Sequence, residues 1–395
     1  MEKLIVIGAG ASGLMAAIRA GRNGASVTVL ERMEKPGKKL LMTGNGKCNL
    51  TNMKQDPQEY HSSQEEFPWR VICAFPLPET LKFFTGLGIY TKNRSGGLYP
   101  YSEQASAVRD VLYMEARHRK VKLKTRERVT GIRKERELFH VSTETYTYQA
   151  ERVILAAGGC ASSVTGSGND GFSLAQSLGH RIVTPLPALV GLKGVGSWFA
   201  KWAGVRFEAA VALLENDRQI AYQRGEVQFT DYGISGIPVF SISRFAARAL
   251  ERGSRVLAVL DFMPDFSVEQ LAAFLESRLE SCSYKTLEES LIGLLPKKLI
   301  PILCTEIRYT MELAQKIKNY PIIIRETGPF SQAQVCSGGV STEEIRPETM
   351  ESTLVPGLYF AGEVVDVDGN CGGYNLQWAW SSAAVAGRAC AKEII

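Results

Sequence analysis

Short apolar runs separated by glycine-rich turns open the chain and predict a sheet with helices between its strands. Residues 3–7 are mostly apolar, as a strand buried on both faces should be. Residues 12–23 repeat apolar side chains at helical spacing, and Gly24 marks the end of that helix. Residues 26–30 form a second strand-like run. Together these segments predict a strand–helix–strand unit within about 30 residues.

The alternation of helix and strand patterns continues to about residue 157. Apolar spacing predicts two further helices, at 78–87 and 103–119. A proline near the start of the first one is well placed, because the first turn of a helix has no use for its N–H group. Residues 121–125, 129–134 and 139–147 are expected to form strands or a hairpin, and 152–157 a further buried strand.

A different pattern occupies the middle of the chain. Residues 190–262 carry alternating apolar positions, glycine turns and short strand-like segments, with a hairpin turn expected within 211–222. Residues 268–319 are rich in Leu, Glu, Lys and Arg at helical spacing, and Pro321 ends that region. Short strand patterns return from residue 330. The simplest organisation is a Rossmann-type domain that is interrupted by an insertion of strands and helices and completed by the C-terminal segment.

Gly8, Gly10 and Gly13 form a GxGxxG motif between the first strand and its helix. In such a motif the first glycine permits a tight turn, the second lets backbone approach a pyrophosphate and the third lets helix and strand pack closely. The helix N-terminus favours the negative phosphate charge. Glu31 closes the second strand, where an acid can bind a ribose hydroxyl pair and disfavours a 2′-phosphate. The unit therefore predicts a site for FAD or NAD rather than NADP.

A second GxGxxG, at residues 166–171, does not carry the same implication. Residues 161–165 separate it from the preceding strand, and no strand ending in an acid follows at the right distance. A turn and helix cap beside the first cofactor site is the expected role.

Two more glycine-rich segments are placed to touch the same ligand. Residues 37–49 follow Glu31 closely, and their glycines and lysines, with Cys48 and Asn49, would track a diphosphate toward a ring system. Near the other end, glycines 372 and 373 precede a helix expected at 377–390. The positive end of that helix would stabilise the anionic reduced ring of a flavin. If both ends of the chain hold one ligand, a bound flavin is favoured over a diffusing nicotinamide.

Composition restricts the class of protein. The chain has 395 residues, and its eight cysteines are scattered without a CxxC pair beside only four histidines, so no metal site is expected. No apolar run reaches the ~18 residues of a membrane span, and no secretory signal pattern precedes the first strand. A cytoplasmic protein with reduced thiols and no membrane partner is expected. The net charge of +5 leaves a polyanionic partner such as RNA open.

Four segments carry a resemblance to a known family. GKKLLMTGNGKCNLTN (37–52) resembles the motif G-(K/R)-K-x-x-x-(S/T)-G-x-G-(K/R)-C-N-x-T-N of the BaiN/RdsA flavoproteins, also known as the aminoacetone oxidase family. QFTDYGISGIPVF (228–240) resembles their F-T-x-x-G-(I/L)-S-G-P segment, although Pro238 falls one position late. Residues 334–352 and 357–383 resemble their C-terminal signatures. The likeness covers nearly the whole chain and is least specific between about 240 and 320.

The resemblance implies an α/β fold with a Rossmann-type FAD-binding domain split in sequence, an inserted β-barrel-like domain and a helical subdomain. The expected boundaries are 1–188 and 342–395 for the FAD-binding domain, 189–266 with a return through 321–341 for the β-domain, and 267–320 for the helices. FAD is expected to bind non-covalently. The residues expected to bind it are Gly8, Gly10, Ala11, Ser12, Gly13, Glu31, Arg32, Lys39, Leu40, Gly46, Lys47, Cys48, Asn49, Val129, Ala157, Gly158, Gly362, Glu363, Gly373, Asn375 and Leu376.

The resemblance points to one cofactor but leaves several substrates possible. It implies an FAD-dependent oxidoreductase, and we expect an NAD(P)H-driven reductase that delivers a hydride from the flavin to an activated carbon–carbon double bond. NAD(P)H would bind transiently, since only one nucleotide fold is expected. The alternatives are a ribosomal RNA dihydrouridine synthase, a small-amine oxidase and a non-catalytic flavin-binding redox protein. The partner is accordingly a small molecule or ribosomal RNA, and the sequence leaves the oligomeric state open.

Reduction of a double bond also needs a proton donor, and two residues are candidates. Cys371 and Tyr374 lie beside the glycines that precede the last helix. For an RNA substrate, the basic residues between 117 and 128 could follow phosphates, and Trp198, Phe199 and Trp202 could stack on bases. A solvated surface and a β-domain core are the ordinary roles of such residues.

Overall fold

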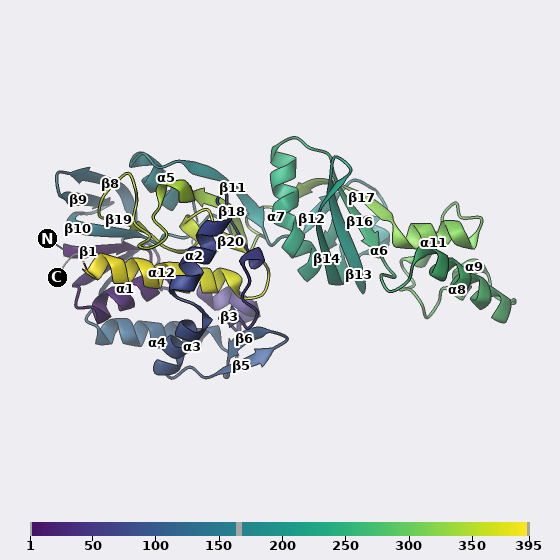
Figure 1. Ribbon diagram of the computed structural model, residues 1–395, viewed down its shortest axis with the longest axis horizontal. Coiled ribbons are helices and arrows are strands. Elements are labelled where there is room, and N and C mark those ends of the chain that lie inside the picture. The colour runs from purple at the N-terminus through teal and green to yellow at the C-terminus, as the bar shows by residue number, and fades with distance from the viewer. Residues whose placement is uncertain (1, 163–167, 393–395) are drawn as a thin grey trace. The chain divides into compact units, whose positions relative to one another are not determined.

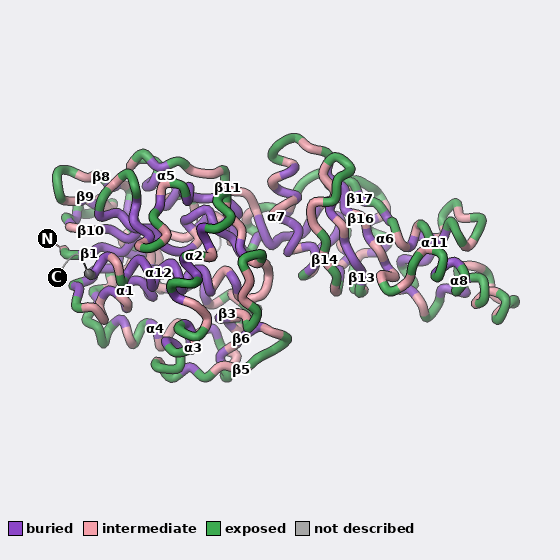
Figure 2. Tube along the Cα trace, viewed as in Figure 1, coloured by how far each residue is buried: buried purple, intermediate pink, exposed green. Residues whose placement is uncertain are grey.

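The computed structural model describes residues 2–162 and 168–392, and the chain divides into two compact units (Figure 1). Unit 1 consists of Met1–Leu186 and Gln334–Ile395, and unit 2 is the continuous segment Pro187–Ala333. The chain therefore leaves unit 1 once and returns to it once. Buried residues run through the interior of each unit, so each has a core of its own (Figure 2).

A seven-stranded sheet forms the centre of unit 1. Its strands are β1 (Glu2–Ile7), β2 (Val27–Glu31), β7 (Lys122–Thr125), β8 (Val129–Glu135), β9 (Leu138–Thr143), β10 (Thr147–Leu155) and β19 (Leu358–Phe360). They lie in the order β7-β2-β1-β10-β9-β8, and β19 pairs with the end of β10. The pairs among β7, β2, β1, β10 and β19 are parallel, whereas β9 pairs antiparallel with both β10 and β8. Every residue of β2 is buried, which explains its lack of polar alternation.

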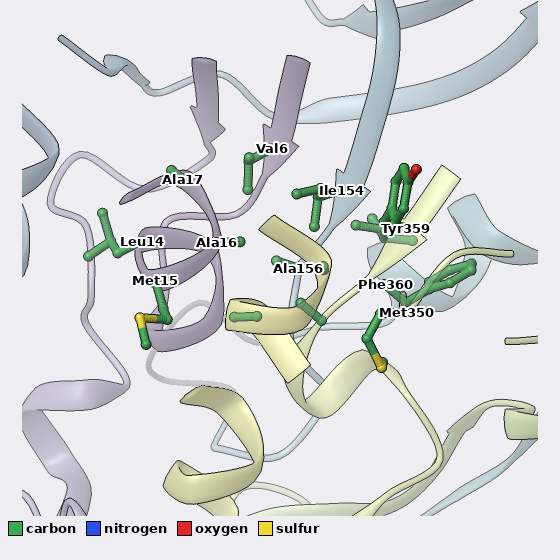
Figure 3. Close-up of a cluster of buried hydrophobic side chains, with 14 of the residues drawn as sticks. Val6, Leu14, Met15, Ala16, Ala17, Ile154, Ala156, Met350, Tyr359 and Phe360 are labelled. Carbon is green, nitrogen blue, oxygen red and sulfur yellow. The ribbon is translucent and has the colours of Figure 1, made fainter. Parts of the chain in front are cut away.

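Two helices from distant parts of the sequence pack together beside this sheet. They are α1 (Ala11–Arg22) and α12 (Tyr374–Lys392). Their backbones approach closely at Gly387, where a Cβ atom would lie 2.4 Å from the carbonyl oxygen of Ala16. Figure 3 shows Met15 and Ala16 of α1 in the same buried cluster as Val6 and Ile154 of the sheet. The first and last helices of the described chain thus share one core.

Smaller elements surround the sheet and its two helices in unit 1. The helices are α2 (Glu66–Ala74), α3 (Leu77–Gly86), α4 (Ala105–His118) and α5 (Asp170–Ser177), with 3₁₀ turns η1 (Leu40–Gly46), η2 (Pro57–Glu59), η4 (Thr342–Glu344) and η5 (Gly362–Val364). The short strands are β3 (Thr51–Asn52), β4 (Tyr60–His61), β5 (Thr91–Arg94), β6 (Gly97–Pro100), β11 (Ile182–Ala188), β18 (Val335–Val340) and β20 (Asp368–Gly369). The last strand to leave unit 1, β11, pairs with β18, on which the chain returns.

The sequence prediction needs two corrections in unit 1. The expected hairpin is present, because β8 and β9 pair antiparallel. Residues 139–147 nevertheless do not form one strand: they contain the end of β9, a turn closed by a hydrogen bond from the Thr143 N–H to the Tyr146 carbonyl (2.7 Å), and the start of β10. Threonine and tyrosine favour strands, which hid the turn. Helix α2 was not predicted, and its buried Phe67, Val71 and Ile72 are what bind it to the core.

Unit 2 is built on a closed barrel of strands in the order β12-β15-β14-β13-β16-β17. These strands are β12 (Leu192–Gly194), β13 (Arg206–Glu215), β14 (Arg218–Phe229), β15 (Gly233–Ser235), β16 (Val256–Asp261) and β17 (Tyr320–Thr327). The predicted hairpin is present, because Asn216 and Asp217 both take positive φ angles, 48° and 67°, between β13 and β14. A two-residue turn of this kind matches the twist of the flanking strands.

The helices of unit 2 are α6 (Phe199–Trp202), α7 (Ile237–Glu251), α8 (Val268–Ser281), α9 (Leu287–Ser290), α10 (Ile300–Cys304) and α11 (Thr310–Lys318). Those after residue 267 were predicted, but α7 lies where only strand-like segments were expected. Its buried Val239, Ile242 and Ala246 recur at helical spacing and pack into the barrel core. Pro238, which departs from the family pattern, lies in the first turn of α7, where proline is tolerated.

Three aromatic residues considered for base stacking belong to unit 2. Phe199 and Trp202 are only 2% and 0% exposed, and the Trp202 indole donates to the Thr230 carbonyl (3.1 Å). Their rings, with that of Trp198, follow one another at centroid distances of 5.1 and 5.3 Å. Phe199 and Trp202 therefore belong to the core of the barrel and are too buried to stack on bases. Among the helices of the described ranges, none is long and apolar enough to cross a membrane.

Candidate functional site

The loop between β1 and α1 shows why its glycines are spaced as they are. Gly8 has a φ of +101°, and a Cβ atom there would lie 2.5 Å from the Ala156 carbonyl oxygen. A Cβ on Gly13 would lie 1.9 Å from the carbonyl oxygen of Gly8, so helix and loop touch through bare backbone. Gly10 differs from both, because a Cβ there would meet nothing within 4 Å. Gly8 and Gly13 thus allow close packing, whereas Gly10 faces open space.

The N-terminus of α1 is built to accept an anion. Its N-cap residue is Gly10, no side chain caps the first turn, and no acidic side chain lies in that turn. The backbone N–H groups at Ala11, Ser12 and Gly13 therefore stand at the positive end of the helix dipole without a capping side chain. A phosphate or pyrophosphate satisfies such groups.

Glu31 ends β2 beside this loop and is 9% exposed. One carboxylate oxygen accepts from the Ala9 N–H at 2.7 Å, and the other accepts from the Met33 N–H at 2.8 Å. The acid therefore ties the glycine loop to the strand that follows it. Arg32, also expected to touch the cofactor, forms an ion pair with Asp170 at 2.8 Å.

The backbone near β8 returns to the end of β2. The Glu127 N–H donates to the Glu31 carbonyl at 2.9 Å, and Val129, buried to 6% exposure, begins β8 two residues later. Asp170, at the start of α5, also contacts Arg128 at 3.0 Å. Residues 168–171 of the second GxGxxG therefore lead into a helix, whereas its residues 166 and 167 lie outside the described residues.

The segment 37–49 lies against the first loop. The Gly37 N–H donates to the Ala9 carbonyl at 2.9 Å, and Leu40, which is 2% exposed, anchors η1 in the core. Cys48 has a φ of +58° and is fully buried, and burial raises the pKa of its thiol to about 12. Beside it, the Asn49 Oδ1 atom is buried without a hydrogen-bond partner. An N–H or O–H group of a ligand would supply the hydrogen bond that this buried oxygen lacks.

The C-terminal segment meets these loops at several points. A Cβ on Gly362 would lie 2.5 Å from the Ser12 hydroxyl oxygen, so the two ends of the chain touch at the start of α1. Glu363 forms an ion pair with Lys39 at 2.6 Å. A Cβ on Gly373 would lie 3.0 Å from the Asn49 Oδ1. The structure therefore brings the two predicted halves of the site together within unit 1.

The loop before α12 is held by its own asparagine. The Gly369 N–H donates to the Asn375 Oδ1 at 2.9 Å, and the Asn375 amide donates back to the Gly369 carbonyl at 2.7 Å. Leu376 is partly exposed in the next turn. Asn375 thus fixes the loop that carries Cys371, and its contact with a cofactor stays a prediction.

The two candidate proton donors differ in their surroundings. Cys371 is partly exposed, and burial raises the pKa of its thiol. Tyr374 is 4% exposed, its ring packs edge-on against Tyr60 at 5.7 Å between centroids, and burial raises its pKa to about 12. Both groups are protonated at neutral pH, and Cys371 is the more accessible of the two.

These features together fit a dinucleotide. The uncapped helix, the open space at Gly10 and the orphaned Asn49 oxygen belong to segments that contacts between the two ends of the chain bring together. A Cβ on Gly158 would also meet nothing within 4 Å, and that on Gly46 would meet only the Leu41 carbonyl oxygen, at 3.9 Å. Lys47 pairs with Glu103 at 3.3 Å at the edge of this region, and Ala157 is half-buried beside Gly158. Within residues 2–162 and 168–392, no group of three or more His, Cys, Asp or Glu side chains is gathered for a metal.

Four of the seven Lys and Arg residues between 117 and 128 form ion pairs with acids. The pairs are Arg119–Glu115, Lys122–Glu2, Arg126–Glu34 and Arg128–Asp170. Lys124 instead contacts the Tyr148 ring and hydroxyl. A surface whose cations already face carboxylates gains less from releasing counterions on a nucleic acid. The arrangement favours a solvated surface.

Sequence reasoning missed three residues in and around this region. Cys160 and Cys336 bring their sulfur atoms within 3.1 Å of each other, although they are 176 residues apart in sequence. Gln377 is fully buried and donates to the Thr80 hydroxyl at 2.8 Å while accepting from the Thr51 hydroxyl at 2.7 Å. The one available signal was position, because Cys160 follows a buried strand and two glycines at the ligand-binding edge of the sheet.

A serine, a histidine and a glutamate also form a chain of hydrogen bonds in unit 1. His180 contacts the Glu344 carboxylate at 3.1 Å and the Ser352 hydroxyl at 2.9 Å. The Ser352 oxygen accepts from the N–H groups of residues 354 and 355, and Ser352 and His180 are 1% and 2% exposed. Because no substrate can reach these groups, the arrangement is a structural network rather than a hydrolytic triad.

We expect this histidine to make the fold sensitive to mild acid. Burial lowers the pKa of His180 from 6.5, although Glu344 opposes the shift. The unfolded chain therefore binds the proton first as the pH falls, and stability is lost below about 6.5 until the folded-state pKa is passed. A tenfold lower proton affinity corresponds to about 1.4 kcal/mol. Urea unfolding at pH 7.5 and 5.5 should show this loss, and the loss should shrink in His180→Gln but not in a variant of the exposed His118. An equal loss in His180→Gln would contradict the assignment.

Comparisons with known proteins come from family, sequence and structure. The model of the HI0933-like protein Rossmann domain matches residues 2–389. The chain is 44% identical to a 3-dehydro-bile acid delta(4,6)-reductase of Clostridium scindens over 100% of both chains. It is 30% identical to a ribosomal RNA dihydrouridine synthase of Escherichia coli, over 99% of this chain and 97% of that protein.

Two solved structures illustrate the fold. A 3-ketosteroid delta1-dehydrogenase from Sterolibacterium denitrificans matches with a TM-score of 0.53 and 13% identity, covering 99% of each chain. A flavocytochrome c3 fumarate reductase in an open conformation matches with a TM-score of 0.50 and 15% identity, covering 100% of this chain and 78% of the other. At such identities the likeness concerns the arrangement of the chain alone.

Proposed function

The chain belongs to the HI0933-like Rossmann family and is an FAD-dependent oxidoreductase, and from that premise we propose that it is a reductase of small unsaturated acids. Its substrate class is a steroid-like acid with a carbon–carbon double bond conjugated to a ketone. NAD(P)H supplies the electrons in this proposal. The single observation that carries it is 44% identity, over the full length of both chains, to a 3-dehydro-bile acid reductase. The relatedness to a dihydrouridine synthase is weaker, at 30%.

The residues present suit FAD. The N-terminus of α1 would hold the diphosphate, Glu31 the adenosine ribose, and Asn49 with Gly373 the ring end of the molecule. When bound, FAD supplies the hydride that a double bond accepts. The hydrogen bonds that Glu31 accepts from the Ala9 and Met33 N–H groups hold this acid at the end of β2.

The chain must supply a proton to the carbon that does not receive the hydride. Cys371 is the better placed donor, because its thiol is partly exposed while burial keeps its pKa raised and the proton in place. The paired hydrogen bonds between Asn375 and Gly369 hold its loop in one conformation. The Lys39–Glu363 ion pair holds the C-terminal segment against the segment 37–49.

The proposal predicts a specific pattern of transient kinetics. The FAD-loaded protein is reduced by NADH or NADPH without air and then mixed with a 3-oxo-4-ene steroid acid. We expect rapid flavin reoxidation and a product heavier by two hydrogens. Cys371→Ala should slow reoxidation by about 100-fold, the size of a typical general-acid effect, and leave reduction by NAD(P)H unchanged. Cys73→Ala, which removes an exposed thiol, is the control.

Other outcomes would replace the proposal. If steroid acids leave the reduced flavin unchanged and deletion of the gene lowers dihydrouridine in ribosomal RNA, the protein is the RNA-modifying enzyme. Reoxidation coupled only to amine turnover in air would make it an amine oxidase. Flavin that binds but reacts with none of these would leave a redox-binding protein. Equal reoxidation rates in Cys371→Ala would remove only the proton-donor role.

A further inference from the structure

Two cysteines meet at the carboxyl end of the central strand of unit 1. Cys160 lies in the loop just after β10, and Cys336 lies in β18. Their sulfur atoms are 3.1 Å apart, about 1 Å longer than a disulfide bond of ~2.05 Å. Both cysteines are free thiols, Cys336 being 1% exposed and Cys160 partly exposed. A small movement would join them.

The backbone around the pair is arranged for sulfur. The N–H groups of Cys160 and Ala161 both donate to the Cys336 Sγ, each at 3.1 Å. The residue before them is Gly159, and a Cβ there would lie 3.0 Å from the same sulfur. A cysteine that merely fills space needs neither backbone donors nor a glycine at this contact. The loop is therefore shaped to hold a polar or charged sulfur.

The two thiols share their protons unequally. The hydrogen bond with Cys336 lowers the pKa of Cys160 below that of an ordinary cysteine. That same hydrogen bond, followed by burial, raises the pKa of Cys336. The pair thus releases its first proton readily and retains the second, as expected of strongly coupled groups. A thiolate shared by two sulfurs is the reactive form in disulfide exchange.

The pair also contacts the segments that form the candidate cofactor site. The Cys336 N–H donates to one Glu363 oxygen at 3.0 Å, and the other oxygen of that carboxylate binds Lys39 at 2.6 Å. A change in the position of Cys336 would therefore shift the Glu363 carboxylate and its ion pair with Lys39, which joins the two ends of the chain. Neither the flavin chemistry nor the proton donor described above uses these thiols.

We propose that Cys160 and Cys336 form a redox-active dithiol, which oxidises reversibly to an intramolecular disulfide by exchange with small-molecule disulfides such as oxidised glutathione. Disulfides of proteins in a reducing compartment are generally of this transient kind. The site is a modification site distinct from substrate reduction.

The exchange proceeds in two steps that balance. The Cys160 thiolate attacks one sulfur of the small disulfide, whose S–S bond breaks and releases one thiolate, leaving a mixed disulfide on Cys160. The Cys336 thiol then loses its proton to the medium, and its sulfur attacks the Cys160 sulfur and releases the second small thiolate. The released thiolates take up protons from water. Two protein thiols are oxidised by two electrons, and one small disulfide is reduced to two thiols.

The test reads the covalent bond in the native full-length protein. The protein is equilibrated in buffers of increasing oxidised-to-reduced glutathione ratio, alkylated, digested without reduction and analysed by mass spectrometry. We expect the peptides containing Cys160 and Cys336 to become linked and the link to vanish with dithiothreitol. Cys336→Ser should instead trap glutathione on Cys160, because the second attack is impossible. Cys160→Ser should show neither product, and Cys73→Ser should behave as the unaltered protein.

The outcomes are independent of the proposed reductase activity, since no substrate or electron donor is added. If both cysteines are alkylated, and so are still free thiols, at every glutathione ratio, the proposal is overturned. So would a link that appears only after denaturation. If Cys336→Ser loses its native circular dichroism spectrum, the linkage in the unaltered protein still decides the question.

Discussion

Replacing Gly10 by alanine should leave the protein folded but weaken its binding of FAD. Gly10 has a φ of −76°, which alanine adopts without strain, and its added methyl group would meet no protein atom within 4 Å. The methyl group would instead occupy the space in front of the uncapped start of α1, where the diphosphate is expected. Overpacking of this kind costs about 1–3 kcal/mol. At 1.4 kcal/mol for each tenfold change, affinity for FAD should fall about 10-fold or more.

Gly13→Ala should fail differently. Its methyl group would overlap the Gly8 carbonyl oxygen, 1.9 Å away, so α1 must move away from the end of β1. We expect loss of both stability and flavin. Gly86→Ala is the matched control, because Gly86 is exposed at the end of α3, its added Cβ meets nothing within 4 Å and its φ angle is not positive.

Thermal unfolding with and without added FAD separates the three variants. A ligand that binds only the folded state raises the unfolding temperature. The unaltered protein and Gly86→Ala should both gain stability from FAD, Gly10→Ala should start equally stable and gain little, and Gly13→Ala should start lower. A Gly10→Ala protein that purifies yellow and gains as much from FAD as the control would show that the diphosphate lies elsewhere.

Gln377→Leu should be among the most destabilising single substitutions in unit 1. The Gln377 side chain is fully buried and donates to the Thr80 and Ser381 hydroxyls, at 2.8 and 2.9 Å, while accepting from the Thr51 hydroxyl. Leucine fills similar space but leaves these hydroxyl groups short of partners. Each unsatisfied buried group costs about 1–3 kcal/mol, so the free energy of unfolding should fall by about 2–5 kcal/mol.

Urea unfolding of Gln377→Leu against Gln176→Leu checks this prediction. Gln176 is exposed on α5, and replacing it by leucine should change the free energy of unfolding by less than about 0.5 kcal/mol. Because Thr51 follows the segment 37–49, the Gln377 variant should also bind FAD more weakly. Equal stability of the two variants would show that water or a shift of α12 satisfies the hydroxyl groups that lose Gln377 as a partner.

The local sequence pattern predicted much of the fold, because the features that are easiest to recognise in the sequence also cause the elements to form. The buried runs of β1 and β2, the glycine loop between them and the hairpin at Asn216 each contain their own explanation in sequence. The split Rossmann domain and the inserted barrel were correctly predicted, with the barrel coming from the family resemblance. Helix α7 was missed because Ile237, Val239 and Phe240 favour strands locally, whereas packing against the barrel makes them helical.

The site shows where such reasoning ends. That both ends of the chain meet was predicted, and the contacts of Lys39 with Glu363 and of Ser12 with Gly362 place them together. The dithiol could not be predicted, since residues 160 and 336 are joined only by the return of the chain through β18. Gln377 was likewise invisible, because its partners come from β3 and α3. Contacts between distant segments carry no local pattern.

The packing of α1 against α12 has a consequence for synthesis on the ribosome. Unit 2 is continuous in sequence, whereas unit 1 lacks β19 and α12 until the whole of unit 2 has been translated. Domains generally fold as they emerge. The barrel of unit 2 can therefore form while the earlier part of unit 1 still exposes the apolar face that α12 will cover, around Ala16. That apolar surface stays uncovered until α12 has been translated and Gly387 packs beside Ala16.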